Sequence, residues 1–369
     1  MRVKLEDVCV RGSSNLKQSD VIDKIGEYPI YGAAGYIGNV DFYHQDQPYV
    51  AVVKDGAGIG RTSLYPAKSS VIGTMQYLLP KENVLPEYLC YVVKYMHLEK
   101  YFTGATIPHI YFKEYKKEEF NLDTLDRQKE IVNILGRIEC VISSRQQELQ
   151  KLDELIKARF VEMFGDLANP ECLWNKSKLI EVCVDKDDIK CGPFGTQLSK
   201  DEYMESGIAV WEIPQINTAF KSRPVHFITS EKAEQLKAYT IIPGDIAMSR
   251  KGNVGKCAIF PENYPAGIIH SDVLRIRINS QLVNPTFMMC QLHFSGAITR
   301  QIELVSSGAI MAGVNVTKLK QIYVHIPPIE LQSQFADFVR AIDKSKVAVQ
   351  KALEKTQLLF DSLMQQYFG

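Results

Sequence analysis

Two stretches of this chain, residues 126–164 and 329–368, carry apolar side chains at helical spacing over many turns, and neither contains proline. A shift of 204 positions superposes them without a gap, and both run into the same Phe-Gly end. The identical pairs include Gln128 and Gln332, Ile138 and Ile342, Gln146 and Gln350, Leu149 and Leu353, Lys151 and Lys355, and Leu155 and Leu359. The sequence therefore predicts two copies of one long helix.

Each predicted helix is about 58 Å long, because an α-helix rises about 1.5 Å per residue. A single apolar stripe of that length cannot stay in water, and a lobe of the available size is only a few tens of ångströms across. We therefore expect the two helices to pack on each other as a coiled-coil-like pair. The alternative is that each helix packs only on its own lobe.

The repeat extends into the segments that precede the helices. Residues 4–10 (KLEDVCV) and 178–184 (KLIEVCV) match at a shift of 174, so the second copy holds about 30 additional residues. Glycine, asparagine and proline between the copies predict a linker. The predicted order is a first lobe at 1–125, a helix at 126–165, a linker at 166–172, a second lobe at 173–328 and a helix at 329–369.

Both lobes contain strand signals followed by glycine-rich turns. Residues 49–53 (YVAVV) run into the turn 54–61, and residues 246–248 (IAM) run into the turn 249–256. A buried run, a glycine turn and a second apolar run are most economically explained as two strands joined by a turn.

Residues 86–101 and 285–302 begin with proline, which is favoured in the first turn of a helix, and they predict helices within the lobes. The predicted class is therefore α+β, with two similar α/β lobes that are each followed by a long helix. Such an internal duplication imitates a two-fold dimer and gives the chain pseudo-two-fold symmetry.

Composition limits the possible functions. The 43 basic and 43 acidic residues give no net charge, so any nucleic-acid contact must use local patches rather than a basic coat. The eight cysteines are scattered and form no CxxC pair, which indicates reduced thiols and a cytoplasmic protein. No apolar run approaches the 18 residues that a transmembrane helix needs.

No catalytic constellation is visible. Residues 252–256 (GNVGK) lack the spacing of a phosphate-binding loop and the Ser or Thr that follows its lysine. Residues 114–116 and 188–190 match only half of a nuclease motif, which often arises by chance. The histidines are dispersed, and we expect His109 and His270 to be structural residues. No metal site or cofactor site is predicted in this chain.

The second-copy turn is instead typical of a binding surface, because it carries three cations and no acid on a glycine-rich backbone. Lysine and arginine suit phosphate contacts, arginine can also pair with guanine, and asparagine can pair with adenine. Residues 113–119 are expected to be a solvated face. The predicted contact residues are Arg250, Lys251, Asn253 and Lys256, the first-copy residues Lys54 and Arg61, and Thr196, Gln197, Gln215 and Asn217 at expected loop positions.

Five segments stand in a characteristic order along the chain: 28–38 (YPIYGAAGYIG), 54–61 (KDGAGIGR), 191–198 (CGPFGTQL), 249–256 (SRKGNVGK) and 326–332 (IPPIELQ). In these segments the chain resembles the specificity subunits of type I DNA restriction-modification systems. The resemblance covers essentially the whole chain and depends on the order of its motifs within two lobe-and-helix repeats. In the first copy Asp123-Thr124 stands where the family usually has a double proline before the helix.

This resemblance implies a subunit that binds double-stranded DNA and has no catalytic activity of its own. Each lobe would be a target-recognition domain for one half of a bipartite, asymmetric site, and antiparallel spacer helices would set the distance between the halves. Two modification subunits would hold S-adenosylmethionine and methylate adenine. Restriction (motor-nuclease) subunits would use ATP and Mg²⁺.

Two other functions remain open from the residues alone. The chain would be a stand-alone DNA-cleaving or methylating enzyme if it contained an unrecognised site. It would be a coiled-coil scaffold if it never bound DNA.

Overall fold

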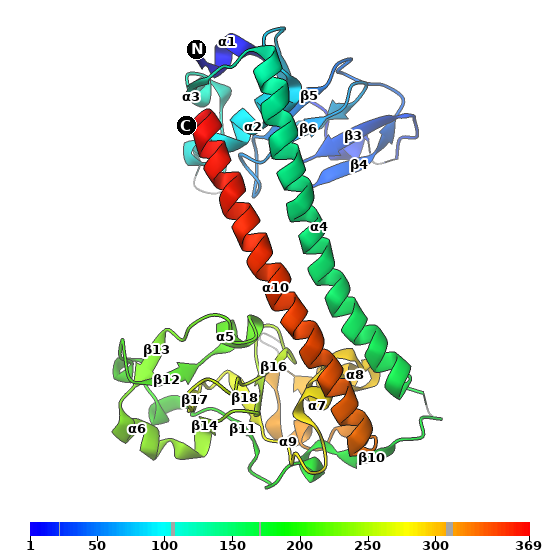
Figure 1. Ribbon diagram of the computed structural model, residues 1–369, viewed down its shortest axis with the longest axis vertical. Helices are drawn as coiled ribbons and strands as arrows, with labels where there is room; N and C mark the ends of the chain where they lie inside the picture. Colours follow the sequence, from blue (N-terminus) through cyan, green and yellow to red (C-terminus); the bar gives the residue numbers. More distant parts are fainter. Residues whose placement is uncertain (22, 105–107, 170, 308–312) are drawn as a thin grey trace. The chain divides into compact units, whose positions relative to one another are not determined.

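The computed structural model describes residues 1–21, 23–104, 108–169, 171–307 and 313–369 (Figure 1). The chain forms two compact units. Unit 1 contains residues 1–147 and 349–369, and unit 2 contains residues 148–348. Each unit therefore consists of one lobe and one half of each long helix.

The two long helices are α4 (Leu125–Phe164) and α10 (Ile329–Phe368), as the repeated apolar stripes predict. Helix α10 follows a double proline, whereas α4 begins without one. Instead, the hydroxyl of Thr124 accepts a hydrogen bond from the backbone N–H of Arg127 at 3.4 Å. This contact satisfies one of the donors that a helix start leaves without a partner.

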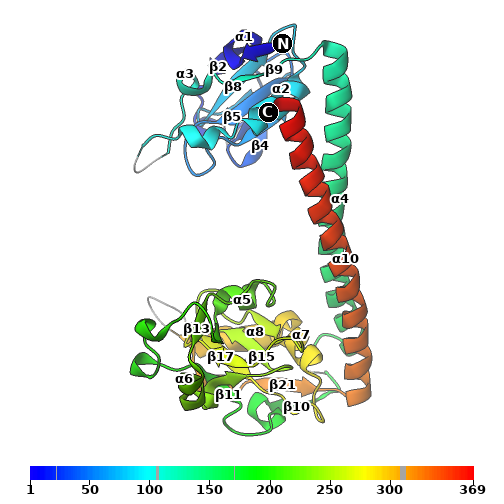
Figure 2. The ribbon, with the colours of Figure 1, turned by 60° about the vertical axis from the view of Figure 1, so that its left-hand side comes forward.

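The helices pair in antiparallel fashion within each unit (Figures 1 and 2). In unit 1 the Arg145 guanidinium donates to the carbonyl oxygen of Ala352 and to the hydroxyl of Thr356. In unit 2 the Lys346 ammonium lies 2.6 Å from a carboxylate oxygen of Asp153. The predicted helix pair is therefore confirmed, and the alternative of helices that pack only on their own lobes is not supported.

In the described residues, the lobe of unit 1 contains two larger sheets and one two-stranded sheet. One has the order β2 (Cys9–Ser13), β8 (Met75–Pro80), β5 (Tyr49–Val53) and β6 (Thr62–Tyr65), and the other β4 (Gly35–Val40), β3 (Tyr28–Gly32) and β7 (Ser70–Val71). Strands β3 and β7 are parallel. The remaining elements are β1 (Arg2–Lys4), which pairs with β9 (Glu119–Asn121), and α1 (Leu5–Val8), η1 (Gln18–Asp20), α2 (Pro86–Tyr95), η2 (Leu98–Tyr101) and α3 (Phe112–Tyr115).

The lobe of unit 2 repeats this topology, with a fourth strand in its second sheet and one additional strand pair. Its sheets are β11 (Ile189–Cys191), β18 (Val273–Ile276), β15 (Ile246–Ser249) and β16 (Cys257–Ile259), and β13 (His226–Ile228), β12 (Ile208–Trp211), β17 (Gly267–Ile269) and β14 (Thr240–Ile241). Strands β12 and β17 repeat the parallel pair β3 and β7. Strand β10 (Asn175–Lys178) pairs with β21 (Tyr323–Ile326), and β19 (Ser306–Ser307) pairs with β20 (Gly313–Val314).

Most described helical segments of the unit 2 lobe are short, and α7 and α8 are the longest of them. They are η3 (Leu179–Val182), η4 (Gly195–Gln197), η5 (Lys200–Glu202), α5 (Ile213–Asn217), α6 (Ser230–Gln235), η6 (Lys237–Tyr239), α7 (Pro285–Phe294), α8 (Gly296–Val305) and α9 (Val316–Leu319). Among the helices that the structure describes, none is long and apolar enough to pass through a bilayer.

The two helices predicted from proline starts are shorter than expected. Helix α2 ends at Tyr95, because His97 takes a left-handed conformation with φ of 49° and a 3-10 turn follows. In unit 2 the extended backbone of Ser295 separates α7 from α8. The apolar pattern continues through both breaks, so it did not reveal them.

A buried glutamine joins the unit 1 lobe to α4. Gln128 has no exposed surface, and its side-chain oxygen accepts from the backbone N–H of Leu85, the residue before α2, at 2.8 Å. Its amide nitrogen donates to the carbonyl oxygens of Asn83 at 3.0 Å and Asp123 at 2.9 Å. One side chain thus ties the start of α2 to the start of α4.

The identical residue of the second copy makes the same set of contacts. Gln332, also fully buried, accepts from the N–H of Asn284, the residue before α7, at 2.8 Å. Its amide nitrogen donates to the carbonyl oxygens of Pro327 at 2.7 Å and Leu282 at 3.5 Å. Gln128 and Gln332 therefore mount the two lobes on their helices in one geometry, and we call them the glutamine clamps.

The far end of the other helix completes each core. In unit 1 the ring of Phe368 from α10 lies 5.2 Å from Tyr88 of α2 in an edge-to-face contact. In unit 2 the ring of Phe164 from α4 lies 4.6 Å from Phe287 of α7 in the same arrangement. Each lobe core is therefore built on both long helices, which explains why the Phe-Gly ends of the two repeats coincide.

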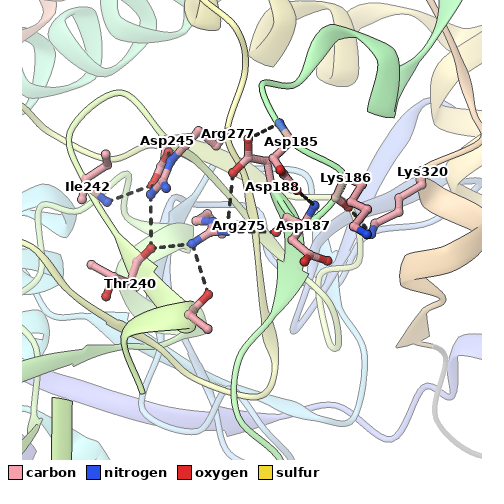
Figure 3. A network of polar contacts seen from close by, with 11 residues as sticks. Asp185, Lys186, Asp187, Asp188, Thr240, Ile242, Asp245, Arg275, Arg277 and Lys320 are labelled. Atoms are coloured by element: carbon pink, nitrogen blue, oxygen red, sulfur yellow. Dashed lines mark hydrogen bonds and ion pairs between the residues drawn. The ribbon is translucent and has the colours of Figure 1, made fainter. Parts of the chain in front are cut away.

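A charged network distinguishes the unit 2 lobe (Figure 3). The Arg277 guanidinium binds both carboxylate oxygens of the buried Asp245 at 2.8 Å. Arg275, which is 5% exposed, donates to the carbonyl oxygens of Thr240 at 2.8 Å and Asp187 at 3.0 Å. These bonds fix β18 to the β14–β15 turn and to the start of β11.

In the unit 1 lobe, aromatic rings occupy the positions of this charged network. The strand registers place Tyr77 where unit 2 has Arg275, and Tyr49 where it has Asp245. The two tyrosines are buried, with ring centroids 5.0 Å apart. The lobes thus share a topology but differ in the interactions that hold their sheets.

We expect Gln332→Ala to destabilise unit 2 by about 2–3 kcal/mol, because it leaves the N–H of Asn284 and the carbonyl of Pro327 buried without a partner. Gln128→Ala should destabilise unit 1 similarly. The control is Gln146→Ala on an exposed helix position, with an effect below about 0.5 kcal/mol. Calorimetric unfolding measures all three, and equal unfolding midpoints for Gln332→Ala and Gln146→Ala would show that the clamp contributes nothing.

Candidate nucleic-acid interface

The turn between two sheet strands has the same construction in both lobes. In unit 1 the N–H of Gly60 donates to the carbonyl of Val53 at 2.9 Å, where β5 leads into the turn. In unit 2 the N–H of Gly255 donates to the carbonyl of Ser249 at 3.1 Å, where β15 leads into it. Both glycines have φ of 81°, a left-handed conformation that disfavours other residues. We call residues 54–61 and 249–256 the recognition turns.

The segment just before the last short helix of each lobe packs on the recognition turn. The N–H of Ile110 donates to the carbonyl of Lys54 at 2.9 Å, and the N–H of Val314 donates to the carbonyl of Arg250 at 3.1 Å. Ile110 and Val314 are equivalent at the 204-residue shift that relates the helices. The repeat therefore extends from the helices to the backbone of the predicted binding surface.

The unit 2 turn holds two of its predicted cations in defined positions. The Arg250 guanidinium lies over the half-exposed ring of Phe194 at 4.9 Å, and its Nε donates to the carbonyl of Val314 at 3.2 Å. The Lys251 ammonium lies 2.8 Å from a carboxylate oxygen of Asp272. Lys256 is exposed at the end of the turn. Arg250 and Lys251 would thus meet a ligand from fixed positions rather than as flexible chains.

The structure brings several predicted residues together around this turn. The side-chain amide of Asn253 donates to the side-chain oxygen of Asn217 at 3.5 Å. Thr196 and Gln197 are exposed on η4, directly after Phe194. The side-chain oxygen of Gln197 accepts from the hydroxyl of Tyr239 at 3.0 Å.

Gln215 is an exception, because the predicted loop position is wrong. It lies in α5 and is 2% exposed. Its side-chain oxygen accepts from the N–H of Glu212 at 3.1 Å, and its amide nitrogen donates to the carbonyl of Arg223 at 2.9 Å. A side chain so placed cannot reach a ligand, and the polar identity of the residue gave no sign of this burial.

The unit 1 turn borders a cationic cavity of about 560 Å³. Lys54 lines it, whereas Arg61 turns aside and donates to the carbonyl of Ala33 at 3.0 Å. The sequence did not predict the other cations of the lining. They are Arg11, Lys113 and Lys116. His109 also lines the cavity, and its Nδ1 lies 2.6 Å from a carboxylate oxygen of Asp55.

Residues 113–119 were expected to form a solvated face, and Lys113 is exposed, but Lys113 and Lys116 also line this cavity. The alternating charges of residues 113–119 gave no indication of this cavity, and Arg11 is distant in sequence from the turn. Because cations outnumber carboxylates around the cavity, its chemistry suits an anion such as a DNA phosphate.

A histidine beside the unit 2 turn has a structural role. His293 of α7 accepts a hydrogen bond through Nε2 from the N–H of Cys257, the first residue of β16, at 2.9 Å. Burial, assisted by the charge of Lys256, lowers the pKa of His293 to about 4. The imidazole is therefore neutral near pH 7, which this accepting role requires. Within the part of the chain that the structure describes, no His, Cys, Asp and Glu side chains gather as a metal site.

Two lobes of one topology, each presenting a cationic turn and mounted on a shared helix pair, define a duplicated DNA-recognition protein. Residues 1–154 and 173–358 match the family model described as the type I restriction modification DNA specificity domain. The chain belongs to this family, and it is a non-catalytic specificity subunit with two such domains.

Relatives agree with this assignment. The chain is 22% identical over 313 residues to the type I restriction enzyme MjaIX specificity subunit of Methanocaldococcus jannaschii, covering 78% of this chain and 69% of that protein. These matches give no support to a stand-alone enzyme or to a scaffold that does not bind DNA.

Solved structures share the fold. The S subunit of a type I restriction-modification system from M. genitalium superposes with a TM-score of 0.62 at 15% identity, covering 100% of this chain and 96% of the other. A chain from a study of complex assembly and conformational transition in the type I R-M system gives a TM-score of 0.56 at 13% identity, covering 100% and 97%.

Proposed function

We propose that each lobe reads one half of a bipartite, asymmetric DNA site. The observation that carries this proposal is the recognition turn, which has one backbone construction in both lobes but different side chains. Lys54 stands where unit 2 has Arg250, and Asp55 stands where it has Lys251. Two lobes whose recognition turns have equivalent backbones but different side chains suit a DNA site with two different halves.

In this proposal residues 1–125 and 173–328 are the target-recognition domains and residues 166–172 are a linker. Residues 126–165 and 329–369 are spacer helices that set the distance between the half-sites. The DNA contacts would include Lys54, Arg61, Thr196, Gln197, Asn217, Arg250, Lys251, Asn253 and Lys256. We no longer include Gln215 among them, because it is buried.

We further propose that the helices dock two modification subunits. Leu155 of α4 and Leu359 of α10 are identical at the 204-residue shift, and they are 45% and 51% exposed. An exposed leucine at equivalent positions of both helices would suit two copies of one partner.

The chemistry would then belong to the partner subunits. The modification subunits would carry S-adenosylmethionine and methylate adenine, and restriction subunits would use ATP and Mg²⁺ to drive DNA cleavage. The complex would act in the cytoplasm, where the eight free cysteines of this chain stay reduced.

The triple variant Arg250→Ala, Lys251→Ala, Lys256→Ala should bind DNA more weakly in complex with the modification subunits. Each lost phosphate contact reduces the slope of log affinity against log salt by about 0.9. We expect the slope to fall by about 2 to 3 in fluorescence-anisotropy titrations. The control variant Lys186→Ala, Lys200→Ala, Lys237→Ala removes equal charge from exposed positions of the same lobe. Unchanged binding by the first variant would refute the turn as a DNA contact.

Leu155→Glu and Leu359→Glu should each reduce the number of bound modification subunits from two to one, because a charge replaces the apolar contact. The double variant should bind none. Native mass spectrometry of the reconstituted complex measures this stoichiometry. Gln146→Glu and Gln350→Glu, another identical pair, control for added charge. Two bound subunits in the leucine double variant would exclude these positions as the docking sites.

A further inference from the structure

The unit 2 lobe contains a loop that the unit 1 lobe lacks. In unit 1, two residues connect β3 to β4, which ends one sheet. In unit 2 the equivalent strands β12 and β13 are connected by residues 212–225, which form α5 and a loop. This insertion accounts for part of the greater length of the second repeat. We call residues 218–225 the insertion loop.

The insertion loop contains two consecutive residues in a disfavoured conformation. Ala219 has φ of 49° and Phe220 has φ of 61°. Residues other than glycine, asparagine and aspartate rarely take this left-handed conformation, and they keep it only where surrounding contacts enforce it. Such backbone outliers cluster at functional sites, so the contacts that enforce this one are informative.

Buried contacts hold the conformation from both sides. The N–H of Phe220 donates to the carbonyl of Gln215 at 2.6 Å, and the Tyr264 hydroxyl donates to the carbonyl of Phe220 at 2.6 Å. The Phe220 ring is 1% exposed and lies 5.4 Å from Trp211. The side-chain amide of Gln215 donates to the carbonyl of Arg223 at 2.9 Å, which closes the loop.

The outer part of the insertion loop presents two cations. Lys221 and Arg223 are exposed, and residues 213–230 contain no aspartate or glutamate. No carboxylate of the described residues forms an ion pair with either side chain. A hydrogen bond of 2.7 Å between the hydroxyls of Thr218 and Ser222 steadies the backbone between them.

The loop lies beside the unit 2 recognition turn. Asn217, just before the loop, accepts from the side chain of Asn253 in the turn at 3.5 Å. Ala219 of the loop and Lys256 of the turn line one cavity. The backbone that carries Lys221 and Arg223 therefore adjoins the recognition turn.

We propose that Gln215 is a positioning residue that holds the insertion loop so that Lys221 and Arg223 contact phosphates of the bound DNA. The inference rests on the proposed function. Phosphate contacts fix the orientation of a protein on the duplex without reading its sequence. The insertion loop therefore adds phosphate contacts that anchor the unit 2 lobe beside the recognition turn.

The variant Lys221→Ala, Arg223→Ala tests the contact. In complex with the modification subunits, on a duplex carrying the site found by methylation mapping, the slope of log affinity against log salt should fall by about 2. Affinity at fixed salt should fall about tenfold or more, and the methylated sequence should stay the same. Lys200→Ala, Lys237→Ala removes two other exposed cations of this lobe and should leave the slope unchanged. An unaltered slope in the first variant, or an equal loss in the control, overturns the proposal.

Gln215→Ala tests the positioning role. It should reproduce most of the loss of slope while the methylated sequence stays the same, whereas general damage to the lobe would change or abolish that sequence. Adding Ala219→Gly should restore part of the slope, because glycine adopts a left-handed conformation without support. Wild-type slope in Gln215→Ala, or no recovery with Ala219→Gly, refutes positioning by Gln215. If the wild-type complex itself does not bind the duplex, it is the proposed function that fails.

Discussion

The glutamine clamps fix each lobe to its long helix, and the rest of the structure depends on this attachment. Gln128 and Gln332 are fully buried, and each links the start of a lobe helix to the start of a long helix through its own amide. A buried side-chain amide needs hydrogen-bond partners for both its oxygen and its nitrogen, so few other arrangements of the surrounding backbone are compatible with it. The same geometry therefore recurs in both units even though little of the surrounding sequence is shared.

The clamps show that one chain contains two copies of a single construction. Each lobe rests on the first half of one long helix and on the last half of the other, where Phe368 and Phe164 complete the cores. Because the attachment of each lobe to the helices is fixed, the side chains and loops that would meet a ligand can differ between the lobes. Buried tyrosines in unit 1 stand where unit 2 has an arginine–aspartate network, and the unit 2 lobe carries the insertion loop.

The sequence predicted the features that depend on periodicity and repetition. The helix pair, the duplicated lobes and the glycine-rich turns follow from apolar spacing and from the 204-residue shift. It could not predict features that depend on tertiary placement. Gln215 looked like a loop residue but is buried, and Arg11 and Lys113 join Lys54 around one cavity from distant positions. Local sequence does not encode which side chains of different strands meet, so only part of the binding surface could be found.

The central claim is that two equivalent frames, joined by paired helices, read two half-sites at a set distance. Inserting seven residues after Leu149 in α4 and seven after Val349 in α10 adds two turns to both helices and nearly keeps their phase. Methylation mapping in cells carrying this variant and its modification partner should then find both half-sites unchanged and the gap longer by up to about three base pairs. An unaltered gap between intact half-sites would contradict the account.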